Sequence, residues 1–182
     1  MIKAFAERGH EKMKEVLMNP DSVGPDVHYY MIRGGIDKKN ITVWESGTVD
    51  GEYIKAYGHY HVGDLEEDYT ILAGSGIILL QSPIVDASVS FFKAIRVKTG
   101  DIVHIPKNTG HLILNTGNIW LVTSDNSPVN FDEKDPVSLP DHADYESVRA
   151  MRGFAYYVID INGEPSFIKN PSYKNVPEVD LV

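Results

Sequence analysis

The chain has 182 residues, and its 17 lysines and arginines against 26 aspartates and glutamates give a formal net charge of −9. This acidic balance argues against a sequence-blind nucleic-acid binder and against a protein that docks on anionic membranes. Hydrophobic residues make up 42% of the chain, and no cysteine is present. The composition therefore predicts one compact domain without disulfides or thiolate zinc sites, in which His, Asp and Glu are the strong metal ligands.

The N-terminal segment predicts a helix. Apolar side chains recur at loosely helical spacing from Ile2 to Met18, and Asn19-Pro20-Asp21 ends the pattern. We expect this helix and its linker to occupy residues 1–26. The first residues are charged, and the apolar runs are too short for a signal sequence or a membrane span, so we expect a cytoplasmic protein.

Residues 27–175 have the texture of a β domain. Short runs rich in Val, Ile, Tyr and Thr alternate with Gly, Asn and Pro, which is typical of antiparallel strands. So many short strands predict a closed sandwich or barrel. The expected strands are Val27–Arg33, Ile41–Glu45, Tyr53–His61, Tyr69–Ala73, Gly76–Ser82, Ser88–Val97, Ile102–Ile105, His111–Asn115, Ile119–Ser124, Phe154–Ile161 and Pro165–Ile168.

Two segments of the chain lack strand signals. Ser124–Tyr145 contains several prolines and few strand formers, so we expect a long surface loop, of a kind that is often functional. Residues 176–182 contain proline and acidic residues, and we expect them to form a frayed tail. No internal repeat indicates a second domain.

The sequence Gly58-His59-Tyr60-His61 is the most informative motif. In a strand, alternate side chains share a face, so His59 and His61 would lie about 6.5–7 Å apart at Cα and could share one ion. A short polar connection leads to Glu66-Glu67-Asp68, where a hairpin would return a carboxylate to the pair. Paired strand histidines are more often partly buried residues without a metal, so the interpretation depends on these neighbours.

His111 lies on a later expected strand and is the natural fourth ligand. Three neutral imidazoles and one carboxylate suit Fe(II), Mn(II), Ni(II) or Zn(II), and six-coordinate geometry leaves two adjacent positions for the vicinal oxygens of a substrate. We expect the other histidines His10, His28 and His104 to be surface or core-edge residues.

These motifs resemble those of the cupin superfamily. The first cupin motif is a glycine, His-x-His, a glutamate and a second glycine, and the second is Gly-Asp, a proline, a histidine and an asparagine. The matching residues are Gly58, His59, His61, Glu67 and Gly74, and then Gly100, Asp101, Pro106, His111 and Asn115. The resemblance implies a mainly β fold, a double-stranded β-helix or jelly-roll barrel with the metal between its two sheets.

Within the cupins, the chain is most similar to the archaeal-type glucose-6-phosphate isomerases, over Tyr29–Pro171. Similarity outside the metal motifs includes Thr42-Val43-Trp44, Asp144-Tyr145 and Gly153-Phe154. The resemblance implies a metal-dependent aldose–ketose isomerase that interconverts glucose 6-phosphate and fructose 6-phosphate. It implies Fe(II) as the first choice of cation, with Mn(II), Ni(II) and Zn(II) as alternatives.

The resemblance also assigns residues to the site. The implied metal ligands are His59, His61, Glu67 and His111. The implied catalytic residues are Glu67, which would carry a proton, Tyr69, which would bind a sugar hydroxyl or orient Glu67, and His142. The implied substrate and phosphate contacts are Thr42, Gly58 and Tyr145.

The chain departs from the isomerase pattern at the carboxylate ligand. The gap between His61 and Glu67 is one residue shorter than is usual in these isomerases, so Glu66 or Asp68 could supply the carboxylate instead. The distance from Glu67 to Gly74 favours Glu67.

The phosphate contacts depart from the pattern as well. Ala56 stands where the family has a phosphate-binding threonine, and the segment after Val122 is longer. A phosphate dianion near an acidic protein needs compensating charge, which Lys55, Arg149 or Arg152 could supply.

Two other functions fit the same ligands, namely a cupin dioxygenase and a non-catalytic sugar-binding cupin. We expect a sugar phosphate as the partner, and neither nucleic acid nor membrane. We also expect a homodimer, because the aromatic strand Val27–Ile32 could pair across chains at a sheet edge.

Overall fold

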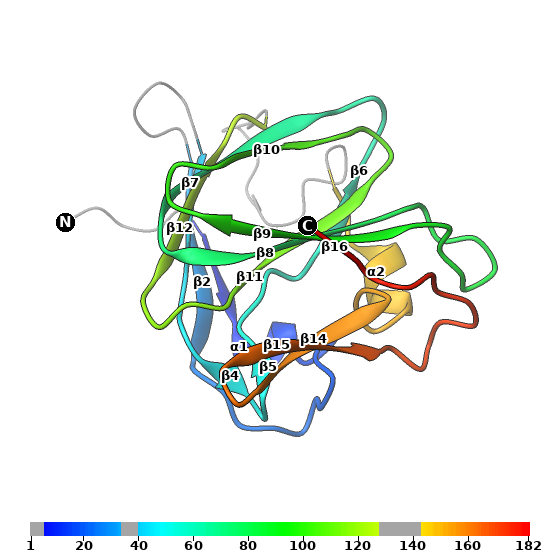
Figure 1. The fold of residues 1–182 in the computed structure, drawn as a ribbon, viewed down its shortest axis with the longest axis horizontal. Helices are drawn as coiled ribbons and strands as arrows, with labels where there is room; N and C mark the ends of the chain where they lie inside the picture. The colour runs from blue at the N-terminus through cyan, green and yellow to red at the C-terminus, as the bar shows by residue number, and fades with distance from the viewer. Residues whose placement is uncertain (1–5, 34–39, 128–142) are drawn as a thin grey trace.

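The computed structural model describes residues 6–33, 40–127 and 143–182, and the fold is described for these ranges. The structure is mainly β, as the sequence predicts, and contains three sheets (Figure 1). The strands are β1 (Ala6–Gly9), β2 (Val27–Ile32), β3 (Asn40–Trp44), β4 (Thr48–Val49), β5 (Glu52–Tyr53), β6 (His59–His61), β7 (Glu67–Ala73), β8 (Ser75–Gln81), β9 (Phe92–Lys98), β10 (Ile102–Ile105), β11 (Gly110–Asn115), β12 (Leu121–Asp125), β13 (Ala143–Asp144), β14 (Tyr156–Ile161), β15 (Glu164–Lys169) and β16 (Asp180–Leu181), and the helices are α1 (His10–Met13) and α2 (Glu146–Ala150).

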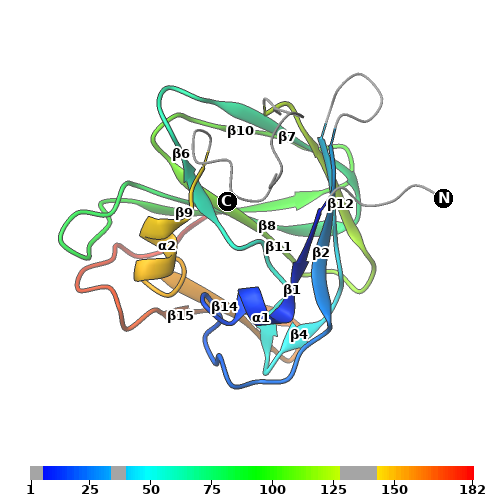
Figure 2. The ribbon, with the colours of Figure 1, turned by 180° about the vertical axis from the view of Figure 1, so that it is seen from behind.

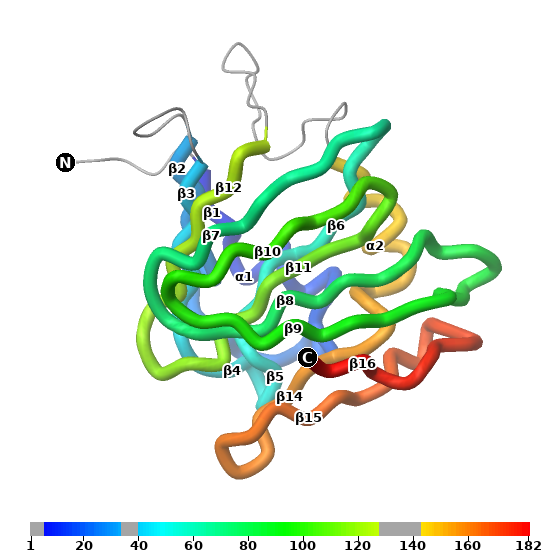
Figure 3. The backbone as a smooth tube through the Cα atoms, turned by 45° about the horizontal axis from the view of Figure 1, so that its top comes forward, coloured from blue at the N-terminus to red at the C-terminus, as the bar shows by residue number. Residues whose placement is uncertain are grey.

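Two of the sheets form the barrel. The first has the order β1-β2-β3-β12-β7-β10, and the second has the order β13-β6-β11-β8-β9-β16. From β6 to β12 the chain passes repeatedly between the two sheets, which is the winding of a jelly roll (Figure 3). The predicted double-stranded β-helix is confirmed, and the space between its sheets holds the core.

The third sheet, β15-β14-β5-β4, covers the outer face of the second sheet, so the central strands of the second sheet are buried along most of their length. Both β8 and β11 are apolar runs, and all six residues of β11 are buried. A strand covered on both faces loses the alternation of a half-exposed strand. One face of these strands lines the barrel, and the other is covered by the C-terminal part of the chain. There the rings of Tyr156 and Phe92 lie 4.8 Å apart, and the Ala155 amide donates to Gln81 Oε1 at 2.9 Å.

The N-terminal segment corrects one prediction. In place of the expected helix over Ile2–Met18, the described residues form a strand followed by a short helix, because Ala6–Gly9 lies beside β2 and pairs with it (Figure 2). The register places Arg8 opposite Tyr29. Pairing with β2 satisfies the backbone N–H and C=O groups of these residues, whereas a short isolated helix is only marginally stable in water. The residues before Ala6 lie outside the described ranges.

The same pairing bears on the expected dimer. β2 lies between β1 and β3, so the strand Val27–Ile32 is not a free sheet edge. The structural reason given for a homodimer is therefore wrong, while the homodimer itself stays a prediction.

The C-terminal residues correct a second prediction. Residues 180–182 are not frayed, because β16 pairs in parallel with β9 and Val182 exchanges 2.9 Å backbone hydrogen bonds with Ala94 and Arg96. The unpaired edge of β9 offers the donors and acceptors that fix this end of the chain. No helix in the described ranges is both long enough and apolar enough to cross a membrane.

Two further expectations need adjustment. The expected strand Tyr53–His61 is broken into β5 and β6, with Gly58 at φ +83° between them. The ends of the expected loop Ser124–Tyr145 are strands, since Ser124 and Asp125 belong to β12 and Ala143 and Asp144 to β13. Residues 128–142 lie outside the described ranges.

Candidate metal centre and adjoining cavity

Three of the predicted ligand histidines come from two neighbouring strands of the second sheet. His59 and His61 are the first and last residues of β6, and His111 on β11 is the register partner of His59. The ring centroids lie 4.4 Å apart for His59 and His111, 4.7 Å for His61 and His111, and 5.3 Å for His59 and His61. Strand pairing therefore gathers three imidazoles at one point of the barrel interior.

Glu67 reaches this point from the opposite sheet. Alternation along β7 turns Glu67, Tyr69 and Ile71 inward. Its Oε1 lies 2.8 Å from His111 Nε2 and 3.3 Å from His61 Nε2. One ligand atom from each of His59, His61, Glu67 and His111 falls within 4.8 Å of the others. The four side chains are thus close enough to bind one ion.

The structure also shows which acidic residue points into the barrel. Asp68 lies on the outer face of β7, and Glu66 directly precedes the strand. Both lie beside His104, whose Nδ1 is 2.8 Å from Asp68 Oδ1 and whose Nε2 is 3.7 Å from Glu66 Oε2. Both carboxylates are about half exposed, at 48%. The shorter gap after His61 therefore leaves Glu67 as the inward carboxylate.

The donor set fits a divalent cation. Glu67 Oε1 and His111 Nε2 are close, but they are buried atoms without a hydrogen-bond partner in the described part of the chain. Buried polar atoms are normally satisfied, and an ion coordinated by both would satisfy them. His61 Nδ1 donates to the Leu65 carbonyl at 3.3 Å and His111 Nδ1 to the Thr109 carbonyl at 3.5 Å, so both rings present Nε2 to the centre.

The charge states also fit. Burial, together with the imidazoles of His111 and His61, lowers the pKa of His59 well below its usual range. Burial alone would raise the pKa of Glu67, but His111 and His61 outweigh it and hold that pKa well below its usual range. A neutral imidazole and an ionised carboxylate are the forms that coordinate metals.

The second oxygen of Glu67 is held by residues that the sequence analysis did not identify. Ser127 Oγ donates to Glu67 Oε2, and the Ser127 amide donates to Asp125 Oδ1 at 3.2 Å. Asn40 Nδ2 donates to the same Asp125 oxygen at 2.7 Å. If the expected strand Ile119–Ser124 is extended by one residue, Asp125 lies on the same inward face of the strand as Leu121 and Thr123.

A cavity of about 60 Å³ adjoins His59 and His111. Every described residue to which the sequence analysis gave a substrate role lines it: Thr42, Gly58, Tyr69 and Tyr145. Ala56, which replaces the family threonine, lines it as well. His142 lies outside the described residues. The cavity therefore joins the candidate metal centre to the predicted substrate contacts.

Gly58 is required by both its backbone conformation and its surroundings. Its φ of +83° is one that L side chains rarely adopt, and a Cβ there would meet Phe154 Cε1 at 2.7 Å and Leu112 Cδ2 at 3.3 Å. The turn at Gly58 directs the next residue, His59, into the barrel. Any larger residue would have to displace Phe154 or Leu112.

The two tyrosines of the cavity are hydrogen-bond donors at neutral pH. Tyr69 lies 5.9 Å from the His111 ring, and burial together with the charge of Glu67 raises the pKa of its hydroxyl well above the usual range. Tyr145 lies 5.1 Å from the His59 ring, and burial raises its pKa to about 12. Both hydroxyls stay protonated and can donate to substrate oxygens.

The basic residue at the cavity is not one of the three that the sequence suggested. Lys55 is buried in an ion pair with Glu52, and Arg149 binds Glu146 Oε1 at 2.7 Å. Neither these two nor Arg152 lines the cavity, whereas Arg33 does. Period-two alternation from Tyr29 and Met31 would have placed Arg33 on the cavity face of the expected strand.

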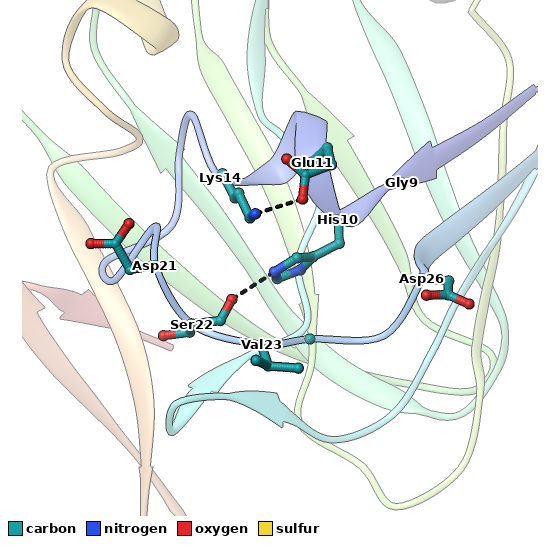
Figure 4. Close-up of a pocket in the computed structure, with 9 residues that line it drawn as sticks. Gly9, His10, Glu11, Lys14, Asp21, Ser22, Val23 and Asp26 are labelled. Carbon is teal, nitrogen blue, oxygen red and sulfur yellow. Dashed lines mark hydrogen bonds and ion pairs between the residues drawn. The ribbon is translucent and has the colours of Figure 1, made fainter.

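A larger cavity of about 390 Å³ lies elsewhere, between α1 and the segment that follows it (Figure 4). Its lining includes His10, Ser22 and Asp26, and His10 Nε2 donates to the Ser22 carbonyl at 2.8 Å. None of the four candidate ligands lines it. Its size alone does not make it a reaction site.

The chain matches a known protein family over most of its length. The profile of the family "Glucose-6-phosphate isomerase (GPI)" matches residues 26–175. The glucose-6-phosphate isomerase of Pyrococcus horikoshii is 33% identical over 135 residues, which cover 74% of this chain and 63% of that protein. That of Pyrococcus furiosus is 33% identical over 134 residues, covering 73% and 62%. The chain thus spans less than two thirds of the length of these relatives.

Similarity to solved structures is weaker. The capsular polysaccharide assembling protein CapF of Staphylococcus aureus has a TM-score of 0.43 at 19% identity, covering 62% of this chain and 30% of that one. A mutant of Bacillus subtilis oxalate decarboxylase has a TM-score of 0.40 at 16% identity, covering 53% and 24%.

Proposed function

Because the chain belongs to the glucose-6-phosphate isomerase family, we propose that it is a metal-dependent isomerase that interconverts glucose 6-phosphate and fructose 6-phosphate. The observation that carries the proposal is the convergence of His59, His61, Glu67 and His111 within 4.8 Å, beside a cavity lined by the predicted substrate contacts. Three imidazoles and a carboxylate suit Fe(II), Mn(II), Ni(II) or Zn(II), and the resemblance to the archaeal-type isomerases puts Fe(II) first.

Isomerisation of an open-chain aldose moves two hydrogens. One passes from C2 to C1 and the other from the C2 hydroxyl to the C1 oxygen, so that the carbonyl moves from C1 to C2. A divalent cation bound by the four ligands would supply Lewis acidity to the two adjacent oxygens. Glu67 is ionised at neutral pH, so its carboxylate can accept the proton from C2 and return it to C1. Ser127 holds that carboxylate through Oε2, which fixes the direction from which it approaches the sugar.

Tyr69 and Tyr145 complete the binding of the sugar chain. Their protonated hydroxyls can donate to sugar oxygens, and neither can act as a base at neutral pH because both pKa values are raised by burial. Thr42 and the Gly58 backbone lie on the same cavity and can contact the phosphate. We propose that these residues orient the substrate, while Glu67 moves the proton.

A coupled assay with fructose 6-phosphate tests the activity. We expect turnover that is lost on chelation, returns with one of the four metals, and falls strongly in His61→Ala and Glu67→Gln. His104→Ala is the matched control, because its ring lies outside the barrel beside Asp68. The absence of turnover with every one of these metals would end the proposal.

The fate of the migrating hydrogen tests the role of Glu67. In deuterated water, proton transfer through the carboxylate exchanges the hydrogen with solvent and labels the product, whereas a direct hydride shift leaves the product unlabelled. Deuterium bound to carbon in the product would show proton transfer, and a product without it that forms at the wild-type rate in Glu67→Gln would restrict Glu67 to binding the cation.

Ala56 gives one reason to keep a second function under test, because the cavity lacks the hydroxyl that the family uses for phosphate. Oxygen consumption with an enol-type substrate would favour a dioxygenase, and tight sugar binding without turnover would favour a binding protein. The proposal also places the enzyme in the cytoplasm as a homodimer, and light scattering would measure the oligomeric state.

A further inference from the structure

Two arginines belong to the side of the cavity formed by the N-terminal strands: Arg33 lines it, and Arg8 packs on Tyr29 and Tyr145, which line it. Arg33 directly follows β2 and lines the cavity, with Nη1 3.4 Å from Thr42 Oγ1. Arg8 lies on β1, opposite Tyr29, and is only 4% exposed. The pairing of β1 with β2 brings both side chains to the same wall of the barrel, although the residues are far apart in the sequence.

Arg8 is buried without a carboxylate. Its Cζ lies 5.9, 5.3 and 5.6 Å from the ring centroids of Tyr29, Tyr57 and Tyr145, and none of the ion pairs among the described residues includes it. Aromatic faces offset part of the cost of burying a cation. A full positive charge nevertheless remains next to two tyrosines that line the cavity, in a protein whose net charge is −9.

The hydrogen bonds of Tyr29 show how that charge reaches the cavity. Its hydroxyl oxygen accepts from Arg8 Nε at 3.0 Å and from the Tyr57 amide at 3.3 Å. A phenol oxygen has two lone pairs, so its own hydrogen is left to donate, and no described residue accepts it. Because Tyr29 lines the cavity, this hydrogen is available to an anion there.

The carboxylate of Asp125, which also lines the cavity, is already engaged. Its Oδ1 accepts from Asn40 Nδ2 at 2.7 Å and from the Ser127 amide at 3.2 Å, so it belongs to the network that holds Glu67. Among the described residues, no ion pair joins it to Arg33. Among the described residues, Arg33 Nη1 donates to the Ile32 carbonyl and the Thr42 hydroxyl, each at 3.4 Å, and no carboxylate pairs with the guanidinium. Its other N–H groups can therefore bind a ligand oxyanion.

We propose that Arg33, together with the Thr42 hydroxyl, binds the phosphate dianion of the substrate, and that Arg8 is a positioning residue that aims the Tyr29 hydroxyl at the same phosphate. This assignment rests on the proposed isomerase function. It names the groups that replace the phosphate-binding threonine for which this chain has Ala56. The phosphate then lies at the end of the cavity near Arg33 and Thr42, the arginine end. The reacting carbons lie at the end near His59 and His111, the ligand end.

The test for Arg33 measures the binding of inorganic phosphate by calorimetry, on the protein as purified and after metal removal, beside steady-state kinetics with fructose 6-phosphate. We expect Arg33→Met to weaken phosphate binding about 10–100-fold and to raise KM similarly, with kcat changed less than about threefold. Arg33→Lys should recover part of the loss. The matched control is Arg149→Met, because Arg149 is an exposed arginine away from the cavity and should bind phosphate like wild type.

Several results would overturn the assignment. These are wild-type protein that does not bind phosphate, Arg33→Met protein with wild-type affinity, or phosphate binding that disappears with the metal and is insensitive to Arg33. If phosphate binding falls in Arg33→Met while no variant turns over sugar phosphates, the anion site stands and the proposed isomerase function fails.

The test for Arg8 must separate positioning from folding. Arg8→Lys keeps the charge but loses the planar donor to Tyr29, and Arg8→Met loses both. We expect Arg8→Lys to raise the phosphate Kd and the KM about three- to tenfold, and Arg8→Met to raise them further, with kcat nearly constant. If the folded fraction of either variant, measured by circular dichroism, binds phosphate like wild type, Arg8 has only a structural role.

Discussion

The two ends of the cavity are built from different parts of the chain. The ligand end uses β6, β7 and β11, which lie inside their sheets and are paired on both sides. The arginine end uses β1, the residue after β2, and β3. One end holds three imidazoles and a carboxylate, while the other holds cations and hydroxyl groups.

The difference reflects how accurately each end must be placed. A metal ion needs ligand atoms within a few tenths of an ångström, and short side chains on paired central strands give that accuracy. A phosphate dianion can be bound from several directions by the guanidinium of a long, flexible arginine side chain. A guanidinium such as that of Arg33, to which we assign the phosphate, can therefore bind it without a change at the ligand end.

Loss of a ligand should give the largest effect. We expect His111→Ala to lose its bound metal and at least about 10³-fold of the isomerase activity, because it removes one of four donors and leaves Glu67 Oε1 without its 2.8 Å neighbour. Elemental analysis and the coupled assay measure the two losses. His104→Ala should retain both, and a metal-loaded, active His111→Ala enzyme would contradict the assignment.

The backbone beside the ligand end should tolerate little change. We expect Gly58→Ala to lower the free energy of unfolding by about 3 kcal/mol, because it combines φ +83° with a 2.7 Å approach to Phe154. Gly63→Ala is the control, since Gly63 has φ +73° and open space around it, and it should cost about 1 kcal/mol. Equal costs in urea unfolding would show that the contact with Phe154 does not matter.

The ligand end could be predicted from the sequence because the His59–His61 pair is local and the resemblance to the cupin motifs supplies Glu67 and His111. Two histidines separated by one residue share a strand face whatever the register, and the same alternation points Glu67 inward and leaves Glu66 and Asp68 to His104. The short gap after His61 left three carboxylates open in the sequence. Once the strand begins at Glu67, the choice follows from geometry.

Only part of the arginine end could be predicted. Alternation from Tyr29 and Met31 indicates Arg33, whereas the place of Arg8 depends on long-range pairing. Arg8 has a role only if residues 6–9 form a strand beside β2, and the helical spacing of Met13, Val16 and Leu17 indicated a helix instead. Those three side chains are buried, so their spacing does report a packed face. Helix propensity alone does not show at which residue such a helix begins. Pairing of residues 6–9 with β2 delays the start of the helix to His10.

The attachment of the N-terminal segment to β2 should depend on pH. His10 donates from Nε2 to the Ser22 carbonyl, so its Nδ1 accepts from His28 Nε2 at 2.9 Å. The remaining nitrogen of His28, Nδ1, is buried without a partner among the described residues. Burial, with the charges of His10 and Lys55, lowers the pKa of His28 to about 4.

The sign of the effect follows from linkage. Between pH 6.5 and about 4 the unfolded chain binds a proton at His28 and the folded protein does not. The stability that His28 contributes is full above pH 6.5 and falls by about 3 kcal/mol as the pH drops to about 4. His28→Gln keeps a donor for His10 but does not titrate, so the difference between its urea unfolding and that of wild type should shrink over this range. A constant difference would contradict the buried neutral pair.

Restoring the missing hydroxyl should give the smallest effect. Ala56 lines the cavity with Thr42 and Arg33, so Ala56→Thr adds a donor to a wall where the arginines already supply charge. We expect the KM for fructose 6-phosphate to fall about threefold in wild type, and about tenfold when Arg33 is Met, because the new hydroxyl then replaces a lost donor. The coupling between the two positions, measured as a double-mutant cycle on KM, tests whether they serve one phosphate. Strictly additive effects would place residue 56 and Arg33 on different parts of the substrate.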